Sequence, residues 1–282
     1  MLVKPSITIM AVFTAWGGMW LAPDAIPAAK VLWTLLGTAL IVGAANTLNC
    51  YIERESDKLM ARTKKRPLPA GRMAPKFALW IGLVLTGISL PILYLYSSPM
   101  TAALAAFALL CYVAIYTPMK QVSSWALLVG SVPGAMPPLL GWTAATESID
   151  GAGLALFGIL FVWQLPHFIA ISMYRQSEYD RAGIKTVAGQ LGLTVAKWQI
   201  LLWTSALVVL SLALVPLDLA GSLYLVSALS LGIIFLLIAI AGFKTQHTSR
   251  WARSVFLYSL IYMNLMVICL AVDHQFGSAG LL

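Results

Sequence analysis

The chain has 282 residues, of which 60% are hydrophobic and only 10% are charged. Soluble domains carry about 25% charged residues, so this composition excludes an ordinary water-soluble fold and makes the lipid bilayer the main solvent. The formal net charge is +8, but the basic residues lie in short segments between apolar stretches, which argues against a nucleic-acid partner.

Apolar stretches of membrane-spanning length recur along the chain and predict an all-α, polytopic membrane protein with nine transmembrane helices in a bundle, a single domain over residues 1–282. With the N-terminus in the cytoplasm, 17 of the 18 Lys and Arg residues fall in cytoplasmic segments and only Lys30 falls on the other side. This asymmetry is the positive-inside pattern, and nine spans would place the C-terminus on the opposite side. The nine stretches cover residues 6–23, 31–51, 77–96, 100–116, 124–146, 153–174, 197–216, 221–243 and 254–272.

The second span runs into the longest polar segment of the chain, Asn49 to Gly71. Within it, Asn49, Glu53 and Asp57 are spaced four residues apart, which on a helix places an amide and two carboxylates on one face. Stacked oxygen ligands suit Mg²⁺, which prefers to share its coordination shell with substrate phosphate. A basic cluster would hold that phosphate from the other side; it consists of Arg62, Lys64, Lys65 and Arg66. The pattern favours a metal-bridged diphosphate site over a charged loop that only fixes the topology.

The fifth span contains three prolines, Pro133, Pro137 and Pro138. Proline interrupts the hydrogen-bond ladder of a helix, and membranes tolerate this where protein or a cavity covers the freed backbone. Two interpretations stay open, a kink that serves packing and a helix that lines a substrate cavity.

The sixth span carries Trp163, Gln164 and His167. Polar residues in a membrane helix usually face the protein interior or a pathway. His167 could ligate iron, donate a proton or only bond a neighbouring helix.

A second polar loop follows, from Tyr174 to Thr186. Its Glu178 and Asp180 could bind a second Mg²⁺, and Arg175 or Lys185 could hold a phosphate or carboxylate. A solvated loop with local ion pairs explains the same residues equally well.

The distribution of charge also bears on the class of protein. None of the nine stretches contains Asp, Glu or Arg, and the only Lys in them is Lys197, the first residue of the stretch 197–216. Ion-coupled transporters and channels usually need charge inside the membrane. The sequence therefore favours an enzyme with its site at the membrane surface, with a non-catalytic transporter as the alternative from another class.

Several motifs resemble a known family. The N-x-x-x-E-x-x-x-D pattern at 49–57 and the run M-A-R-T-K-K-R-P-L-P-A-G at 60–71 resemble the first signature of the UbiA superfamily of intramembrane prenyltransferases. More narrowly, the chain resembles the heme-modifying branch of that superfamily, and the resemblance extends to about residue 195. The motifs that carry it are V-K-P-S-I-T at 3–8, Y-T-P-M-K at 116–120, P-G-A-M-P-P-L-L-G-W at 133–142 and W-Q-L-P-H-F at 163–168.

The resemblance implies a nine-helix bundle around a central cavity in a bacterial-type inner membrane, with the active site facing the cytoplasm. It implies Mg²⁺-dependent transfer of a farnesyl group from farnesyl diphosphate to a vinyl group of protoheme IX (heme B), giving heme O. It also suggests heme A synthase or terminal-oxidase assembly factors as protein partners. A UbiA-type enzyme acting on another aromatic acceptor, such as 4-hydroxybenzoate, is the runner-up.

The resemblance also assigns roles to residues. The catalytic Mg²⁺–diphosphate ligands would be Asn49, Glu53 and Asp57, and diphosphate would bind Arg62, Lys65 and Arg66. Heme would contact His167, Trp163 and Arg175. In the second polar loop the matching residues are Glu178, Tyr179 and Lys185. That loop lacks the repeated aspartates of other superfamily members, and Lys185 matches the wider superfamily rather than the heme-modifying branch.

Overall fold

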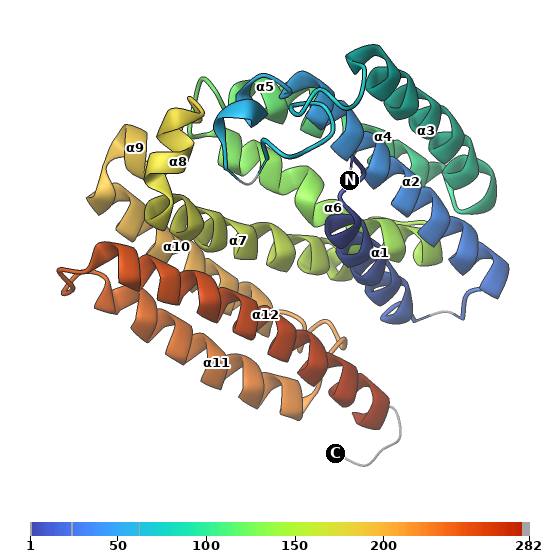
Figure 1. Cartoon of the computed structure of the whole chain (residues 1–282). Coiled ribbons are helices and arrows are strands. Elements are labelled where there is room, and N and C mark those ends of the chain that lie inside the picture. The colour runs from blue at the N-terminus through green and yellow to red at the C-terminus, as the bar shows by residue number, and fades with distance from the viewer. Residues whose placement is uncertain (1, 24, 62, 278–282) are drawn as a thin grey trace. The chain divides into compact units, whose positions relative to one another are not determined.

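The computed structural model of the chain describes residues 2–23, 25–61 and 63–277, with side chains to 275, and over these residues it is entirely helical (Figure 1). Most of the helices follow one another along the chain with short connections, and the longest connection, residues 53–74 between α2 and α3, contains η1. The elements are α1 (Pro5–Trp20), α2 (Ala28–Ile52), the 3₁₀-helix η1 (Ser56–Leu59), α3 (Pro75–Tyr96), α4 (Pro99–Leu110), the π-helix η2 (Cys111–Tyr116), α5 (Thr117–Met119), α6 (Ala126–Thr146), α7 (Gly151–Tyr174), α8 (Gln176–Arg181), α9 (Val187–Leu191), α10 (Leu193–Leu212), α11 (Ser222–Ala241) and α12 (Thr248–Gly277).

The all-α membrane class is confirmed, but the prediction of nine spans is wrong. Among the described residues, seven helices are long and apolar enough to cross a membrane. Two of the nine predicted spans drop out. The first is α1, whose 16 residues fall short of the roughly 20 that a bilayer requires. The other is α6, in which prolines, glycines and hydroxyl residues dilute the apolar ones. The seven are Ala28–Ile52, Pro75–Tyr96, Pro99–Met119, Gly151–Tyr174, Leu193–Leu212, Ser222–Ala241 and Thr248–Gln275.

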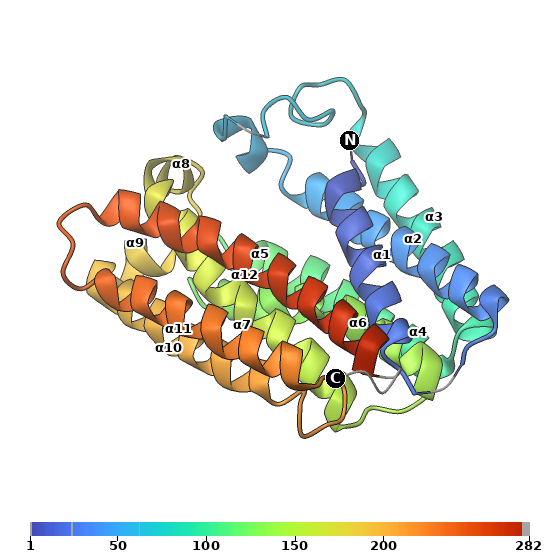
Figure 2. The same cartoon turned by 90° about the horizontal axis from the view of Figure 1, so that it is seen from below.

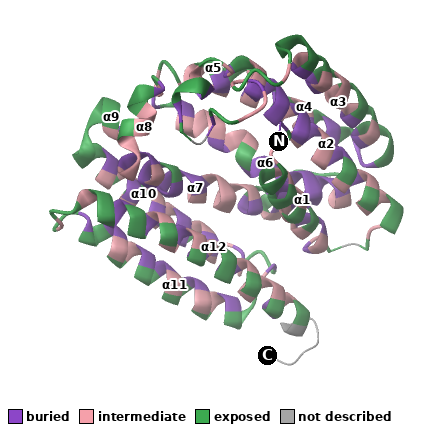
Figure 3. Cartoon of the chain, viewed as in Figure 1, coloured by how far each residue is buried: buried purple, intermediate pink, exposed green. Residues whose placement is uncertain are grey.

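The outward faces of these helices are apolar. Exposed and buried residues alternate around each helix (Figure 3), and many of the exposed side chains are large hydrophobic ones, such as Trp80, Leu95, Val209 and Leu237. A soluble protein rarely exposes so much contiguous apolar surface. A lipid environment accounts for it, because lipid tails solvate these side chains as well as a protein core does.

The chain divides into two compact units by its internal contacts. The first unit comprises residues 1–153 and 177–185, and the second comprises residues 154–176 and 186–282. The division falls within α7, so most of this helix belongs to the second unit. The single-domain assignment over 1–282 stays a prediction.

In the first unit, segments predicted to share one side of the membrane lie together. The Lys4 side chain reaches Asn49 at the end of α2, and the backbone N–H of Lys185 donates to the Lys120 carbonyl at 2.9 Å. At the start of α2, Lys30 pairs with Glu147 beyond the end of α6, at 2.8 Å. Within the first unit these contacts bring together segments that the charge pattern assigns to the same side, and the side of the membrane that each group faces stays a prediction.

Helices α1 and α6 of this unit meet backbone to backbone (Figure 2). A Cβ atom at Gly18 would overlap the Pro138 carbonyl, and one at Gly141 would overlap the Ala15 carbonyl. Helix α6 runs unbroken through its three prolines, and Pro138 packs directly on α1. Of the two interpretations of the proline run, packing has a direct structural basis here.

We expect Gly18→Ala to destabilise the protein by about 1–3 kcal/mol, because the new methyl group would overlap a backbone carbonyl that cannot move aside. Gly17→Ala is the matched control: it lies in the same helix and has no atom within 4 Å of the added Cβ. Thermal unfolding of both variants in detergent would measure this. Equal midpoints for the two variants would contradict the close packing of α1 on α6.

Candidate functional site

The candidate site begins where α2 ends. The expected helical face through Asp57 is interrupted, because the α-helix stops at Ile52 and η1 begins only at Ser56. Side chains of the following turn bond the carbonyls at this helix end. Arg54 donates to the Tyr51 carbonyl at 2.8 Å, and Ser56 donates to the Glu53 carbonyl at 3.1 Å.

The four-residue spacing nevertheless persists through the backbone. The N–H of Glu53 donates to the Asn49 carbonyl at 2.9 Å, and the N–H of Asp57 donates to the Glu53 carbonyl at 2.8 Å. The three predicted ligand residues are therefore linked by successive helical turns, although α2 itself carries only the first of them.

All three residues are buried, with exposed fractions of 1% for Asn49, 5% for Glu53 and 4% for Asp57. A buried carboxylate is costly unless it is paired. Each of the three meets a cation. Lys4 Nζ donates to Asn49 Oδ1 at 3.0 Å, Lys120 forms an ion pair with Glu53, and Arg66 Nη1 lies 2.7 Å from Asp57 Oδ2.

The Asn49 amide is held in one orientation. Its Nδ2 donates to Thr117 Oγ1 at 3.1 Å, while the Thr117 hydroxyl donates its only proton to the Tyr112 carbonyl at 2.7 Å. Thr117 directly follows η2, and π-helical turns often occur at functional sites. As a result, the oxygen of Asn49 is the atom that faces the Lys4 ammonium.

The loop after η1 is folded back onto the end of α2. The Thr63 hydroxyl donates to the Asp57 carbonyl at 2.8 Å, and Leu68 packs with Leu2, Cys50 and Ala78 in an apolar cluster. The same cluster anchors the N-terminus, so the residues just before α1 deliver Lys4 to the site.

The predicted basic cluster is divided by the structure. Arg66 reaches Asp57, as described. The Lys65 side chain is exposed, and its carbonyl accepts from Arg72 at 2.6 Å. Arg62 lies outside the described residues.

Two further cations, Lys4 and Lys120, were not among the sequence-predicted site residues. Each is a single lysine at the end of an apolar stretch, where it has a topological explanation. Their places in the motifs at 3–8 and 116–120 are the signal that could have identified them. Burial lowers the pKa of Lys120 to about 7, and the Lys4 ammonium adds to that shift.

The second polar loop lies beside Lys120, because the backbone N–H of Lys185 donates to the Lys120 carbonyl. Its acidic residues lie on α8, where Glu178 and Tyr179 are half-buried and Asp180 is exposed. Among the residues that the structure describes, no group of three or more His, Cys, Asp and Glu side chains is placed to hold a metal. A metal at Asn49, Glu53 and Asp57 would thus need additional ligands from a substrate.

In the second unit, His167 and Trp163 lie together on α7. Their rings stack with centroids 4.8 Å apart, and both bond Ser259 on α12: His167 Nδ1 lies 2.7 Å from its hydroxyl, and Trp163 Nε1 donates to its carbonyl at 2.7 Å. Arg175 follows the end of α7, with its guanidinium 5.5 Å from the centre of the Tyr174 ring. The structure therefore joins two of the three predicted heme-contact residues.

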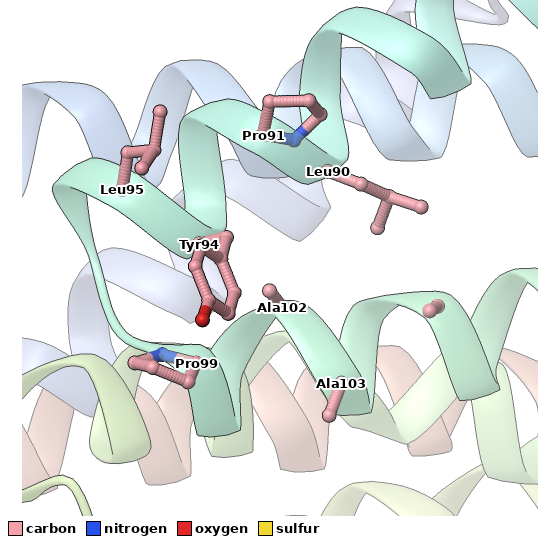
Figure 4. Close-up of a pocket in the computed structure, with 8 residues that line it drawn as sticks. Leu90, Pro91, Tyr94, Leu95, Pro99, Ala102 and Ala103 are labelled. Carbon is pink, nitrogen blue, oxygen red and sulfur yellow. The ribbon is translucent and has the colours of Figure 1, made fainter.

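An apolar groove of about 550 Å³ lies between α3 and α4 (Figure 4). It is lined by Leu90, Pro91, Tyr94, Leu95, Pro99, Ala102, Ala103 and Ala106. None of these eight residues is charged, and Tyr94 alone carries a polar side-chain group, so the groove offers no chemistry comparable to the polar end of the unit.

The chain is similar to known proteins over almost its whole length. The model of the UbiA prenyltransferase family matches residues 10–261. A protoheme IX farnesyltransferase of Myxococcus xanthus is 48% identical over 273 residues, covering 97% of this chain and 93% of that protein. One of Nitrosomonas eutropha is 38% identical over 277 residues, covering 98% and 93%.

Solved structures share the fold. A structure described for digeranylgeranylglyceryl phosphate synthase superimposes with a TM-score of 0.81 at 18% identity, covering 97% of this chain and 96% of that one. A UbiA homologue from Archaeoglobus fulgidus bound to DMAPP and Mg²⁺ has a TM-score of 0.65 at 15% identity, covering 97% and 98%.

We expect Lys120→Met to lower stability by about 3–5 kcal/mol, because it leaves the buried Glu53 carboxylate without its cation. Adding Glu53→Gln should restore much of that loss. Lys58→Met, which removes the exposed partner of Glu55, should barely change the unfolding midpoint. The midpoints of thermal unfolding in detergent would be compared for the wild type and these three variants. If Lys120→Met were as mild as Lys58→Met, the buried pair would not be structurally important.

Proposed function

The chain belongs to the UbiA prenyltransferase family, and we propose that it transfers the farnesyl group of farnesyl diphosphate to a vinyl group of protoheme IX. The products are heme O and diphosphate. The observation that carries the proposal is the near-full-length similarity to curated proteins named protoheme IX farnesyltransferase. The part of the site that would bind farnesyl diphosphate contains the buried residues Asn49, Glu53 and Asp57.

We propose Mg²⁺ as the cofactor, held by the oxygens of Asn49, Glu53 and Asp57. The donor set fits, because it consists of two buried carboxylates and one amide whose oxygen is already oriented. Oxygen-only ligation of this kind suits Mg²⁺, which takes its remaining ligands from water and substrate phosphate. When bound, Mg²⁺ would neutralise charge on the diphosphate leaving group.

The cations of the site would bind the diphosphate itself. Arg66 and Lys120 already lie against the two carboxylates, and Lys4 lies against the amide oxygen. An arriving diphosphate offers these cations a second anionic partner through charge-assisted hydrogen bonds. The exposed Lys65 would extend this basic surface toward water, and Arg62, which lies outside the described residues, stays a proposed diphosphate ligand. Because the carboxylates are buried, water would have little access to the allylic cation formed when the C–O bond breaks.

The acceptor would be held by other residues. We propose His167, Trp163 and Arg175 as contacts of protoheme IX, with Glu178, Tyr179 and Lys185 of the second loop closing the polar end. The vinyl carbon attacks the farnesyl cation, and water captures the resulting cation to give the hydroxyethylfarnesyl product. Trp163 presents a ring face suited to stabilising positive charge.

The protein is a multi-pass membrane protein of this family. We propose that it lies in a bacterial-type inner membrane with its N-terminus and active site facing the cytoplasm and its C-terminus on the other side. Mg²⁺ and the diphosphate head of farnesyl diphosphate are both water-soluble, so a site that faces the cytoplasm is accessible to both. Heme A synthase or terminal-oxidase assembly factors would receive the product.

Incubating the purified chain with hemin, farnesyl diphosphate and Mg²⁺ should give a heme heavier by a hydrated farnesyl group, detected by mass spectrometry. Activity should vanish with a chelator and in Asp57→Ala or Glu53→Ala. Glu55→Ala is the matched control, since Glu55 lies in the same loop but is exposed, and should stay active. Prenylation of 4-hydroxybenzoate in place of hemin would overturn the proposed acceptor, and full activity of both acidic variants would overturn the metal assignment.

The orientation can be tested with Lys65→Cys, which places a thiol on the exposed loop. In intact cells a membrane-impermeant maleimide should leave this thiol unlabelled, and it should react once the inner membrane is opened. A cysteine replacing Glu147, which is exposed at the opposite end of the first unit, should react without opening that membrane when the outer membrane is permeabilised. The reverse pattern would invert the proposed topology.

A further inference from the structure

The second unit contains a buried hydrogen-bond chain that the transfer of a prenyl group does not by itself require. It links His167 on α7 with Ser259 on α12. His167 Nδ1 lies 2.7 Å from Ser259 Oγ, and Ser259 Oγ donates to the Phe256 carbonyl at 2.6 Å. Both His167 and Ser259 are buried, at 8% and 0% exposure.

The number of protons available in this set of hydrogen bonds determines the tautomer of the imidazole. A serine hydroxyl has one proton and two lone pairs. If that proton goes to the Phe256 carbonyl, Ser259 can only accept from the ring, so the proton of a neutral His167 is on Nδ1. The remaining nitrogen, Nε2, then carries the free lone pair. In proteins, metal-ligating histidines are typically oriented in this way by a hydrogen bond at the other ring nitrogen.

The surroundings hold the ring in place. Trp163 stacks on it with ring centroids 4.8 Å apart, and Phe256 packs at 4.7 Å. Trp163 also donates to the Ser259 carbonyl, so two side chains of α7 bond the same residue of α12. The rings pack on the imidazole and fix its plane. A neutral nitrogen donor among aromatic side chains suits a metal such as heme iron rather than a hydrated hard cation, because hard cations prefer oxygen ligands.

We propose that His167 Nε2 is the axial ligand of the iron of the protoheme substrate and that Ser259 is the positioning residue that sets this tautomer. The inference rests on the proposed function, since it assigns the acceptor's metal to a named atom. Ligation at iron fixes the porphyrin at its centre and leaves the peripheral vinyl groups unbound for reaction.

The test uses the full-length chain in nanodiscs, titrated with hemin and followed by visible absorption and electron paramagnetic resonance. Wild type should show a histidine-ligated ferric spectrum. His167→Gly should lose it and regain it when imidazole is added, which a purely structural role would not produce. Ser259→Ala should weaken hemin affinity about 10-fold. Ser254→Ala is the matched control, because its hydroxyl bonds only a backbone carbonyl of the same helix, that of Arg250, and should bind hemin as wild type does.

A second measurement needs no substitution at the ligand. The chain has three histidines, so ¹⁵N-histidine spectra of the hemin-free protein can be assigned with His247→Ala and His274→Ala. One neutral histidine should be protonated at Nδ1 and unprotonated at Nε2, and Ser259→Ala should admit the other tautomer. A His167 protonated at Nε2 in wild type would overturn the assignment.

The two proposals fail differently. If wild type farnesylates hemin while His167→Gly keeps the wild-type spectrum, or if Ser259→Ala binds hemin as tightly as Ser254→Ala, the axial-ligand inference is wrong and the proposed function stands. If wild type neither binds nor farnesylates hemin, both are wrong.

Discussion

The polar end of the first unit depends on the neutralisation of two buried carboxylates. Glu53 and Asp57 lie at the end of an apolar helix with only 5% and 4% of their surface exposed, and neither could stay ionised there alone. Their partners come from different parts of the chain: Arg66 from the following loop and Lys120 from beyond α5. Charge pairing thus connects the first polar loop to the end of the span Pro99–Met119, and the Lys120 carbonyl in turn accepts from the backbone of the second loop.

Much of this site could be predicted from the sequence, because its acids and one of its cations are neighbours in the chain. The spacing of Asn49, Glu53 and Asp57 needs only helical periodicity, and Arg66 follows within a few residues. Lys4 and Lys120 could not be found in this way, since their partners are 45 and 67 positions away and a lone lysine at a span end has an ordinary topological explanation. The end of α2 was missed because Arg54 and Ser56 act on specific carbonyls, and hydropathy carries no information about such contacts. Hydropathy also overcounted the spans, since it registers the apolar character of α1 but not its short helical length.

The two units use the same device to orient a functional side chain. Thr117 and Ser259 each give their single hydroxyl proton to a backbone carbonyl and are left to accept from a side-chain nitrogen, of Asn49 in one case and His167 in the other. Each hydroxyl thereby orients its partner. The Asn49 oxygen is left facing Lys4, and in the proposed tautomer the lone pair of His167 lies on Nε2. Such orientation costs little in a membrane helix, where hydroxyl residues readily bond the preceding turn.

Stability is a poor explanation for the buried ion pairs, because apolar residues of similar volume are often as stabilising or more so. The diphosphate site proposed for these residues explains them better. A site that binds a highly charged leaving group needs cations in place before the ligand arrives, since groups that are already positioned reorganise little during the reaction. At the proposed site, Glu53, Asp57 and the Asn49 oxygen hold those cations in position. The same contacts that neutralise the buried carboxylates would therefore also assemble the cations of the proposed diphosphate site.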